Sequence, residues 1–138
     1  MTTEIEEVVN FYQSFDKYKH LKKKLLRNHL TKSFEYKQYK IHRKDNKIVA
    51  FTNWIFLSKE HEDHFENYGQ ILNHFWNSGD RCWIIDSVSD HSYFNMVYDW
   101  AKTYFGKELQ LDSVSWLKVG NDYKVSSIHK KYNRKEYR

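Results

Sequence analysis

Residues 82–88 read Cys-Trp-Ile-Ile-Asp-Ser-Val and follow a turn-forming stretch, Asn-Ser-Gly-Asp, at residues 77–80. A short apolar run directly after turn residues predicts a β-strand. Residues 48–56, Ile-Val-Ala-Phe-Thr-Asn-Trp-Ile-Phe, form a second apolar run, without the alternation of a half-exposed strand. Such a run predicts a strand that is buried on both faces. The two stretches therefore predict a β-sheet in the middle of the fold.

Helix and strand patterns extend on both sides of this sheet. Apolar residues recur at helical spacing over residues 3–30, as one long helix or two short ones. Residues 35–43 and the turn at Asp45 and Asn46 predict a hairpin with the strand that follows. The other expected elements are a helix from Ser58 through Gly69 to Phe75, a helix from Asp90 that stops at Gly106, and strands at residues 113–118 and 123–128 around a turn at residues 120–122.

The order of these elements predicts an α/β fold. Helix, hairpin, helix, strand, helix and hairpin follow one another, which favours a mixed β-sheet flanked by helices, with a helix at the N-terminus. With 138 residues the chain is long enough to bury a core of its own. We expect a single domain over residues 1–138, in which residues 129–138 form a basic tail.

Composition indicates the cellular setting. Aromatic residues make up 18% of the chain, which argues against disorder. The single cysteine, Cys82, excludes an intramolecular disulfide framework and suits a reducing cytosol. The first residues, Met-Thr-Thr-Glu-Ile-Glu-Glu, lack the apolar segment of a signal peptide, and the apolar run at residues 48–57 is too short to cross a membrane. We therefore expect a cytoplasmic protein without membrane insertion.

Charge is distributed unevenly along the chain. Residues 17–47 hold twelve Lys and Arg against two acids, whereas residues 58–112 hold ten acids against four bases. Residues 118–138 are basic again, with seven bases against two acids. This pattern indicates either an anionic partner or an ordinary solvated lysine face. Binding of single-stranded nucleic acid is a third interpretation, although the chain has no RNA- or DNA-binding motif.

Common catalytic and cofactor motifs are missing. The chain contains no Gly-x-Gly-x-x-Gly, P-loop or Gly-x-Ser-x-Gly sequence. His61 and His64 are three residues apart, one fewer than in the zinc motif His-Glu-x-x-His, so a solvated acidic helix start explains them better. Cys82 opens a buried strand, which favours a packed and unreactive thiol. We expect no metal.

Asp86 is the first functional candidate, because it is an acid inside an apolar strand. Burial of a carboxylate is unfavourable unless a cation or a hydrogen-bond donor pairs with it. One interpretation is that Asp86 lies at the open end of its strand and caps a loop or helix. The other is a functional acid at the carboxyl end of the strand, where open α/β sheets form their ligand crevices.

Several motifs around Asp86 resemble those of the toxin-activating lysine acyltransferases, which fatty-acylate RTX protoxins. Residues 49–58 are similar to that family's Val-Ala-Tyr-x-x-Trp…Leu-Ser segment. Trp76, followed by Ser-Gly-Asp-Arg-x-Trp-x-Ile-Asp at residues 78–86, resembles its Trp-x-Ser-Gly-Asp-Arg-x-Trp-Phe-Ile-Asp signature, and residues 102–109 resemble its Lys-Lys-Phe-Pro-Asp-Glu-Leu stretch. The resemblance implies a fold like that of the GNAT acetyltransferases.

The resemblance also implies a reaction and its residues. The family transfers an acyl chain from acyl-carrier protein to the ε-amine of a lysine in a protein, and relies on an Asp at the position of Asp86 and on an upstream His. A small gap places that histidine at His20, and His29 is the second choice. The histidine would act as general base, because a lysine ammonium must lose a proton before it attacks a thioester. Asp86 would orient the histidine, and acyl-CoA is the alternative donor.

Two groups of residues are expected to bind the donor. Lys22, Lys23 and Lys24 lie close to His20 in the sequence and would contact an acidic acyl-carrier protein. Trp54 and Trp83 would line an apolar groove for the acyl chain, although aromatic residues in such strands more often belong to the core.

The main alternative is a catalytically inactive GNAT-like protein with a binding or structural role. It includes a phage-encoded virion or host-interaction protein. Acyl transfer to a protein acceptor is expected under the first hypothesis, and a fixed copy number in purified virus particles under the second.

Overall fold

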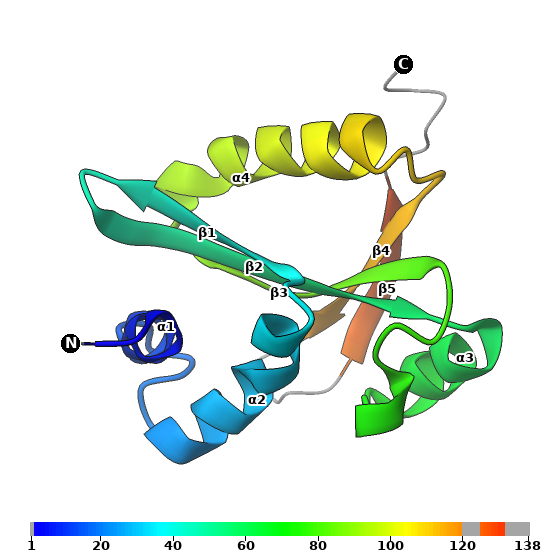
Figure 1. Ribbon diagram of the computed structural model, residues 1–138, viewed down its shortest axis with the longest axis horizontal. Coiled ribbons are helices and arrows are strands. Elements are labelled where there is room, and N and C mark those ends of the chain that lie inside the picture. The colour runs from blue at the N-terminus through cyan, green and yellow to red at the C-terminus, as the bar shows by residue number, and fades with distance from the viewer. Residues whose placement is uncertain (1, 120–124, 132–138) are drawn as a thin grey trace.

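The computed structural model describes residues 2–119 and 125–131, with the side chains of residues 2–116, and contains a five-stranded sheet between helices (Figure 1). The first half holds α1 (Glu4–Gln13), α2 (Lys23–Glu35), β1 (Tyr39–Lys44), β2 (Lys47–Leu57) and α3 (Lys59–Tyr68). The second half holds β3 (Arg81–Ser89), α4 (Phe94–Ala101), β4 (Val114–Val119) and β5 (Val125–Lys131). Short 3₁₀ turns occupy Asn73–Phe75 and His91–Tyr93, and α4 continues as a π-helix over Lys102–Glu108.

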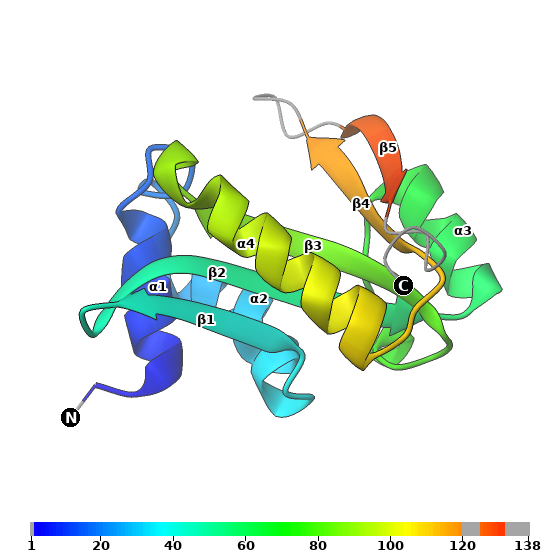
Figure 2. The ribbon, with the colours of Figure 1, turned by 90° about the horizontal axis from the view of Figure 1, so that it is seen from above.

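The sheet is mixed and divides into two parts. Its strands follow the order β1-β2-β3-β4-β5, and all neighbours are antiparallel except β3 and β4. These two strands pair through Trp83 with Ser115 and through Ile84 with Trp116. Beyond that point β4 and β5 turn away from β1–β3 (Figure 2). Within the described residues, the second half of β3 therefore has no strand partner on the β4 side.

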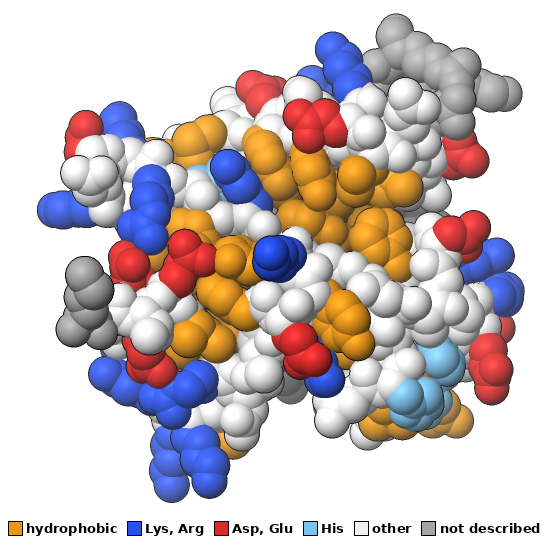
Figure 3. Space-filling view, viewed as in Figure 1, with side chains coloured by type: hydrophobic (Ala, Val, Ile, Leu, Met, Phe, Trp, Pro, Cys, Tyr) orange, Lys and Arg blue, Asp and Glu red, His pale blue; other side chains and the backbone are white. Residues whose placement is uncertain are grey.

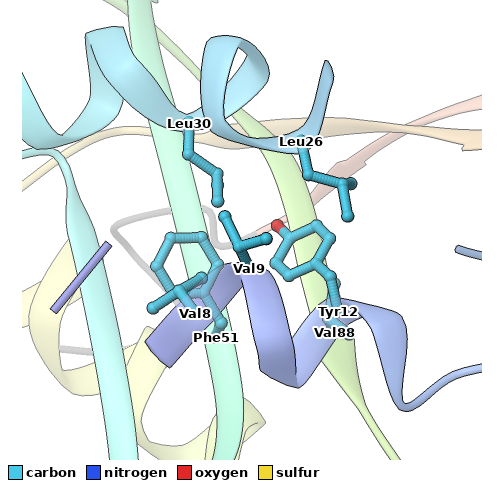
Figure 4. Close-up of a cluster of buried hydrophobic side chains, with 7 residues drawn as sticks. All are labelled: Val8, Val9, Tyr12, Leu26, Leu30, Phe51 and Val88. Carbon is cyan, nitrogen blue, oxygen red and sulfur yellow. The ribbon is translucent and has the colours of Figure 1, made fainter. Parts of the chain in front are cut away.

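Helices cover both faces of the sheet. The first three helices lie on one face and α4 lies on the other (Figure 1). Three buried clusters fill the spaces between these layers. They comprise Val8, Val9, Tyr12, Leu26, Leu30, Phe51 and Val88 under α1 and α2 (Figure 4), Trp54, Cys82, Ala101, Phe105 and Val114 under α4, and Ile55, Leu57, Phe65, Phe75 and Trp83 beside α3.

The structure confirms the predicted α/β class, with a mixed sheet, flanking helices and an N-terminal helix, and it is consistent with a GNAT-like fold. The first hairpin turns at Asp45 and Asn46, whose φ angles of 53° and 66° are those of a type I′ turn. Residues 3–30 form two helices rather than one, and the second runs on to Glu35. Cys82 is buried, as predicted.

Both glycine predictions were wrong. Gly69 does not lie inside a helix but ends α3, because its φ of 64° is the left-handed conformation that closes a helix C-terminus. Phe75 consequently belongs to a separate 3₁₀ turn. Gly106 does not stop the last helix, which continues to Glu108 as Phe105 packs fully buried against Trp54.

Two predictions concern residues that the structure does not describe: the turn at residues 120–122 and the part of the basic tail at residues 132–138. Residues 129–131, also expected in the tail, belong to β5. Among the described residues, none of the helices combines the length and the apolar character that a membrane crossing requires.

Candidate active site

Asp86 lies on β3 opposite Asn53 of β2, on the face of the sheet that α1 and α2 cover. Its side chain is 14% exposed. The pairing of the two strands shifts next to it: Asn53 pairs with Asp86, but Trp54 pairs with Ile84, so Ile85 is an extra residue in β3. Such β-bulges redirect side chains and are common beside active sites.

His29 meets the carboxylate of Asp86. It lies in the middle of α2, and its Nε2 is 2.6 Å from Asp86 Oδ2. The imidazole is 44% exposed, so a reactant can reach it from solvent. Because Nε2 faces the carboxylate, Nδ1 is the ring nitrogen that remains for proton transfer with a substrate.

Tyr12 of α1 completes a three-residue network. Its hydroxyl donates to the same oxygen, Asp86 Oδ2, at 2.7 Å. The ring is fully buried among the aliphatic side chains of α1 and α2, with its hydroxyl oxygen on the side of α2 (Figure 4). A buried tyrosine hydroxyl usually has a partner of this kind. Helices α1 and α2 and strand β3 thus each contribute one polar group to the site.

The charges in this network depend on one another. The negative charge of Asp86 raises the pKa of His29, although partial burial acts in the opposite direction. Burial acts to raise the pKa of Asp86, but the charge of His29 and the hydrogen bonds from His29 and Tyr12 outweigh it and keep that pKa below its ordinary value. Burial and the charge of Asp86 raise the pKa of Tyr12 far above the ordinary value. The network therefore stabilises a carboxylate beside an imidazolium.

The structure brings together Asp86 and the second-choice histidine. His20, the first choice, is exposed in the turn-rich connection between α1 and α2. No sequence pattern singled out Tyr12, because it occupies an ordinary core position of a helix and the chain has 11 tyrosines.

The expected donor-binding residues lie in different places. Lys22, Lys23 and Lys24 are exposed at the start of α2, where positive side chains gather in Figure 3. Trp54 lies on the other face of the sheet, 3% exposed, in contact with the aromatic rings of α4 and its π-helical extension. Trp83 is fully buried beside α3. Neither tryptophan belongs to the cluster around Tyr12.

The Ser-Gly-Asp-Arg-x-Trp segment forms a separate polar corner where β2, α3 and β3 meet. The carboxylate of Glu62, 3% exposed, accepts hydrogen bonds from Arg81 at 3.1 Å and from the Trp83 indole at 2.8 Å. Ser78 accepts from the backbone N–H of Ser58 at 3.0 Å. A Cβ on Gly79 would lie 2.5 Å from backbone atoms of Leu57 and Ser58. This motif therefore shapes a corner of the fold.

Among the described residues, no group of three or more His, Cys, Asp or Glu side chains could hold a metal ion. The dyad of His29 and Asp86 can instead accept and release a proton, as imidazole–carboxylate pairs do in acyl-transfer enzymes.

Comparison with known proteins points in the same direction. A family model described as the RTX toxin acyltransferase family matches residues 2–132. The leukotoxin-activating lysine-acyltransferase LtxC of Aggregatibacter actinomycetemcomitans is 28% identical over 106 residues, which cover 76% of this chain and 62% of that protein. The protein-lysine myristoyltransferase HlyC of Escherichia coli is 33% identical over 75 residues, which cover 54% of this chain and 43% of that protein. The chain thus matches less than two thirds of the length of either relative.

Proposed function

The chain belongs to the RTX toxin acyltransferase family, and on that premise we propose that it transfers an acyl chain from a thioester donor to the ε-amine of a lysine in a protein. His29 is the proposed general base and Asp86 the group that orients it. The observation that carries the proposal is the 2.6 Å contact between His29 Nε2 and Asp86 Oδ2 at a half-exposed imidazole.

The proposed reaction uses the free nitrogen of His29. A neutral lysine amine attacks the carbonyl carbon of the thioester, and Nδ1 takes the proton that this nitrogen loses as the amide forms. The carbon–sulfur bond then breaks, and the sulfur leaves as a thiol with that proton. Asp86 stabilises the imidazolium between the two steps, since its own pKa is held low.

The thioester oxygen needs hydrogen-bond donors as negative charge develops on it. We propose backbone N–H groups of β3 beyond Ile84 for this role, other than that of Asp86, which donates to Asn53, since β3 and β4 are paired only up to Ile84 in the described part of the chain.

The proposed donor is acyl-carrier protein, with acyl-CoA as the alternative. Carrier proteins of this class are acidic, and Lys22, Lys23 and Lys24 form a positive surface at the start of the helix that carries His29. Leu25, one turn before His29 on the same helix face, is 56% exposed and offers an apolar contact. A carrier bound at this surface would place its thioester near the dyad. Because carrier protein and chain would meet in the cytoplasm, we place the reaction there.

The test is acyl transfer followed by intact mass. Purified protein is incubated with myristoyl-acyl-carrier protein and an RTX protoxin fragment that carries acceptor lysines, and the mass added to the fragment is measured. His29→Gln and Asp86→Asn should lose most of the transfer, whereas His20→Gln, which removes the exposed histidine between α1 and α2, should retain it. Myristoyl-CoA replaces the carrier protein in a parallel reaction.

Two results would contradict the proposal. Equal transfer by the wild type and by Asp86→Asn would remove the site. No transfer by the wild type from either donor would favour the catalytically inactive GNAT-like protein, whose expected signature is presence in purified virus particles.

A further inference from the structure

The bulge at Ile85 decides where Asp86 points. On either side of it the pairs are Trp54 with Ile84 and Asn53 with Asp86. Ile85 packs with the cluster beside α3, and Asp86 contacts α1 and α2, so two successive residues of β3 face the same side of the sheet. In a regular strand they would alternate, and Asp86 would point toward α4, away from His29.

A buried polar chain accompanies the bulge. The backbone N–H of Asp86 donates to Asn53 Oδ1 at 2.8 Å. Asn53 Nδ2 lies 3.4 Å from Ser33 Oγ, and that hydroxyl donates to the carbonyl of Leu30 at 2.9 Å. Asn53 is 1% exposed and Ser33 is fully buried. Three elements, β3, β2 and α2, are therefore joined by polar contacts, of which those of Ser33 are buried and that of the Asp86 N–H is partly buried.

This chain runs beside the dyad. Ser33 follows His29 by four residues on α2, so the two side chains lie on the same face of that helix. One link between α2 and β3 is the contact of His29 with the Asp86 carboxylate. The other runs from Ser33 through Asn53 to the Asp86 backbone. Two links at adjacent turns of α2 fix both the distance of this helix from Asp86 and its rotation about its own axis.

We propose that Asn53 and Ser33 are positioning residues that hold the bulged backbone of Asp86 and the His29 turn of α2 at the separation the dyad requires. The inference rests on the proposed function for its catalytic consequence, but the geometry it describes can be measured without any substrate.

A comparison within β2 supports a specific role for these contacts. Thr52, the residue before Asn53, is equally buried on the opposite face of the sheet, and its hydroxyl has no hydrogen-bond partner among the described residues. Buried polar groups that are fully paired tend to fix one arrangement of a core. Within the described residues, the hydroxyl of Thr52 on the α4 face has no partner, whereas the amide of Asn53 contacts both β3 and α2.

The experiment replaces Asn53 by Leu, which keeps the size of the side chain and removes both hydrogen bonds. Thr52→Val is the matched control on the same strand. In each variant the pKa of His29 is measured by NMR titration of its ring protons, and kcat and KM are measured with myristoyl-acyl-carrier protein. For Asn53→Leu we expect the pKa of His29 to move down toward its ordinary value and kcat to fall about 10- to 100-fold with KM nearly unchanged, since a shift of roughly 1 Å at a catalytic group has this order of effect. Thr52→Val should match the wild type in both.

The outcomes separate the two proposals. A His29 pKa and a kcat in Asn53→Leu equal to those of the wild type would overturn the positioning role. If Asn53→Leu does not fold, Ser33→Ala removes the second contact alone, and its His29 pKa should shift in the same direction by a smaller amount; no shift would overturn the inference. If His29→Gln leaves acyl transfer intact, the proposed function fails, while the titration of His29 in Asn53→Leu still decides the positioning question.

Discussion

Two carboxylates on the same side of the sheet, Glu62 buried and Asp86 partly buried, have different partners. Glu62 accepts from Arg81 and from the Trp83 indole, and neither of these donors gives up its proton near neutral pH. Asp86 accepts from Tyr12 and contacts His29, whose imidazole exchanges a proton in the physiological range. The comparison teaches that burial of an acid alone does not indicate chemistry; the partner decides whether the acid faces a group that can exchange a proton.

The two regions also differ in access. Glu62 is 3% exposed and its corner is closed by the contact of Gly79 with the end of β2. His29 is 44% exposed beside Asp86. Solvent reaches the imidazole but not the Glu62 carboxylate. We therefore expect substitutions around Asp86 and His29 to act on rate, and substitutions in the Glu62 corner to act on stability.

The largest expected effect is on rate, in Asp86→Asn. This change keeps the size of the side chain and removes the charge that orients and stabilises the His29 imidazolium, so the transfer rate should fall by roughly 10²- to 10⁴-fold. Glu62→Gln is the matched change in the other region and should leave the rate per folded molecule within about twofold, because that region does not touch the reactants. Initial rates with each variant, corrected for the folded fraction by circular dichroism, make the comparison. A similar loss of rate in both variants would contradict the claim that only the region of Asp86 and His29 acts on rate.

The next effect is on stability, in Gly79→Ala. The new Cβ would lie 2.5 Å from the carbonyl oxygen of Leu57 and from backbone atoms of Ser58, so the corner must shift. Overpacking of this kind destabilises a fold by about 1–3 kcal/mol. Urea unfolding measures the change in free energy, and the rate of the remaining folded protein should stay at the wild-type value. A wild-type unfolding midpoint would show that the corner is looser than its contacts indicate.

How much of this could be predicted from the sequence differs between the two regions. The order of apolar runs and helical patterns along the chain was sufficient for the class of fold, and the acid inside an apolar strand was sufficient to single out Asp86 as a candidate. They were not sufficient for the histidine, because the distance between two segments depends on how α2 packs on the sheet, and His20 and His29 are equally polar in the sequence. The bulge at Ile85 and the role of Tyr12 have no local signal, since both arise from tertiary pairing.

In the Glu62 corner the sequence signal was strong, but it did not indicate what the residues do. Its residues carry the strongest sequence resemblance, and one of them, Trp83, was expected to line an acyl groove. In the structure Trp83 is fully buried and donates to Glu62, and Ser78 and Gly79 pack against the end of β2. The predictions for Gly69 and Gly106 were wrong for a similar reason. Gly69 ends α3, whereas Gly106 lies buried inside the last helix, and the packing of the neighbouring residues decides between these outcomes.

A smaller effect on rate is expected for Tyr12→Phe. The variant keeps the buried ring and removes one donor to Asp86, so the pKa of Asp86 should rise and the carboxylate should be held less firmly. A hydrogen bond to a charged group contributes about 1.5–3 kcal/mol, part of which His29 retains, so we expect roughly a tenfold loss of rate. Tyr18→Phe, a change in the ring next to Tyr12, is the control and should lose less. Equal rates for Tyr12→Phe and the wild type would remove Tyr12 from the site.

The smallest effect concerns pH. The charge of Asp86 raises the pKa of His29 above 6.5, and the base form is required, so the rate should increase with pH and level off above that raised pKa. In Asp86→Asn the main cause of the shift is gone, so the residual rate should level off at a lower pH, whereas Glu62→Gln should keep the wild-type profile.

The stability of the fold should also depend on pH through this pair. The raised pKa of His29 stabilises the folded state below pH 6.5, and this contribution disappears as the pH rises through the raised pKa. The lowered pKa of Asp86 stabilises the folded state above pH 3.8, and this contribution is lost as the pH falls through the lowered pKa. The pair therefore contributes most to stability between pH 3.8 and pH 6.5, the ordinary pKa values of the two groups. Urea midpoints measured from pH 3 to 9 should lose this contribution in Asp86→Asn and keep it in Glu62→Gln, and rate profiles over the same range should shift only in Asp86→Asn.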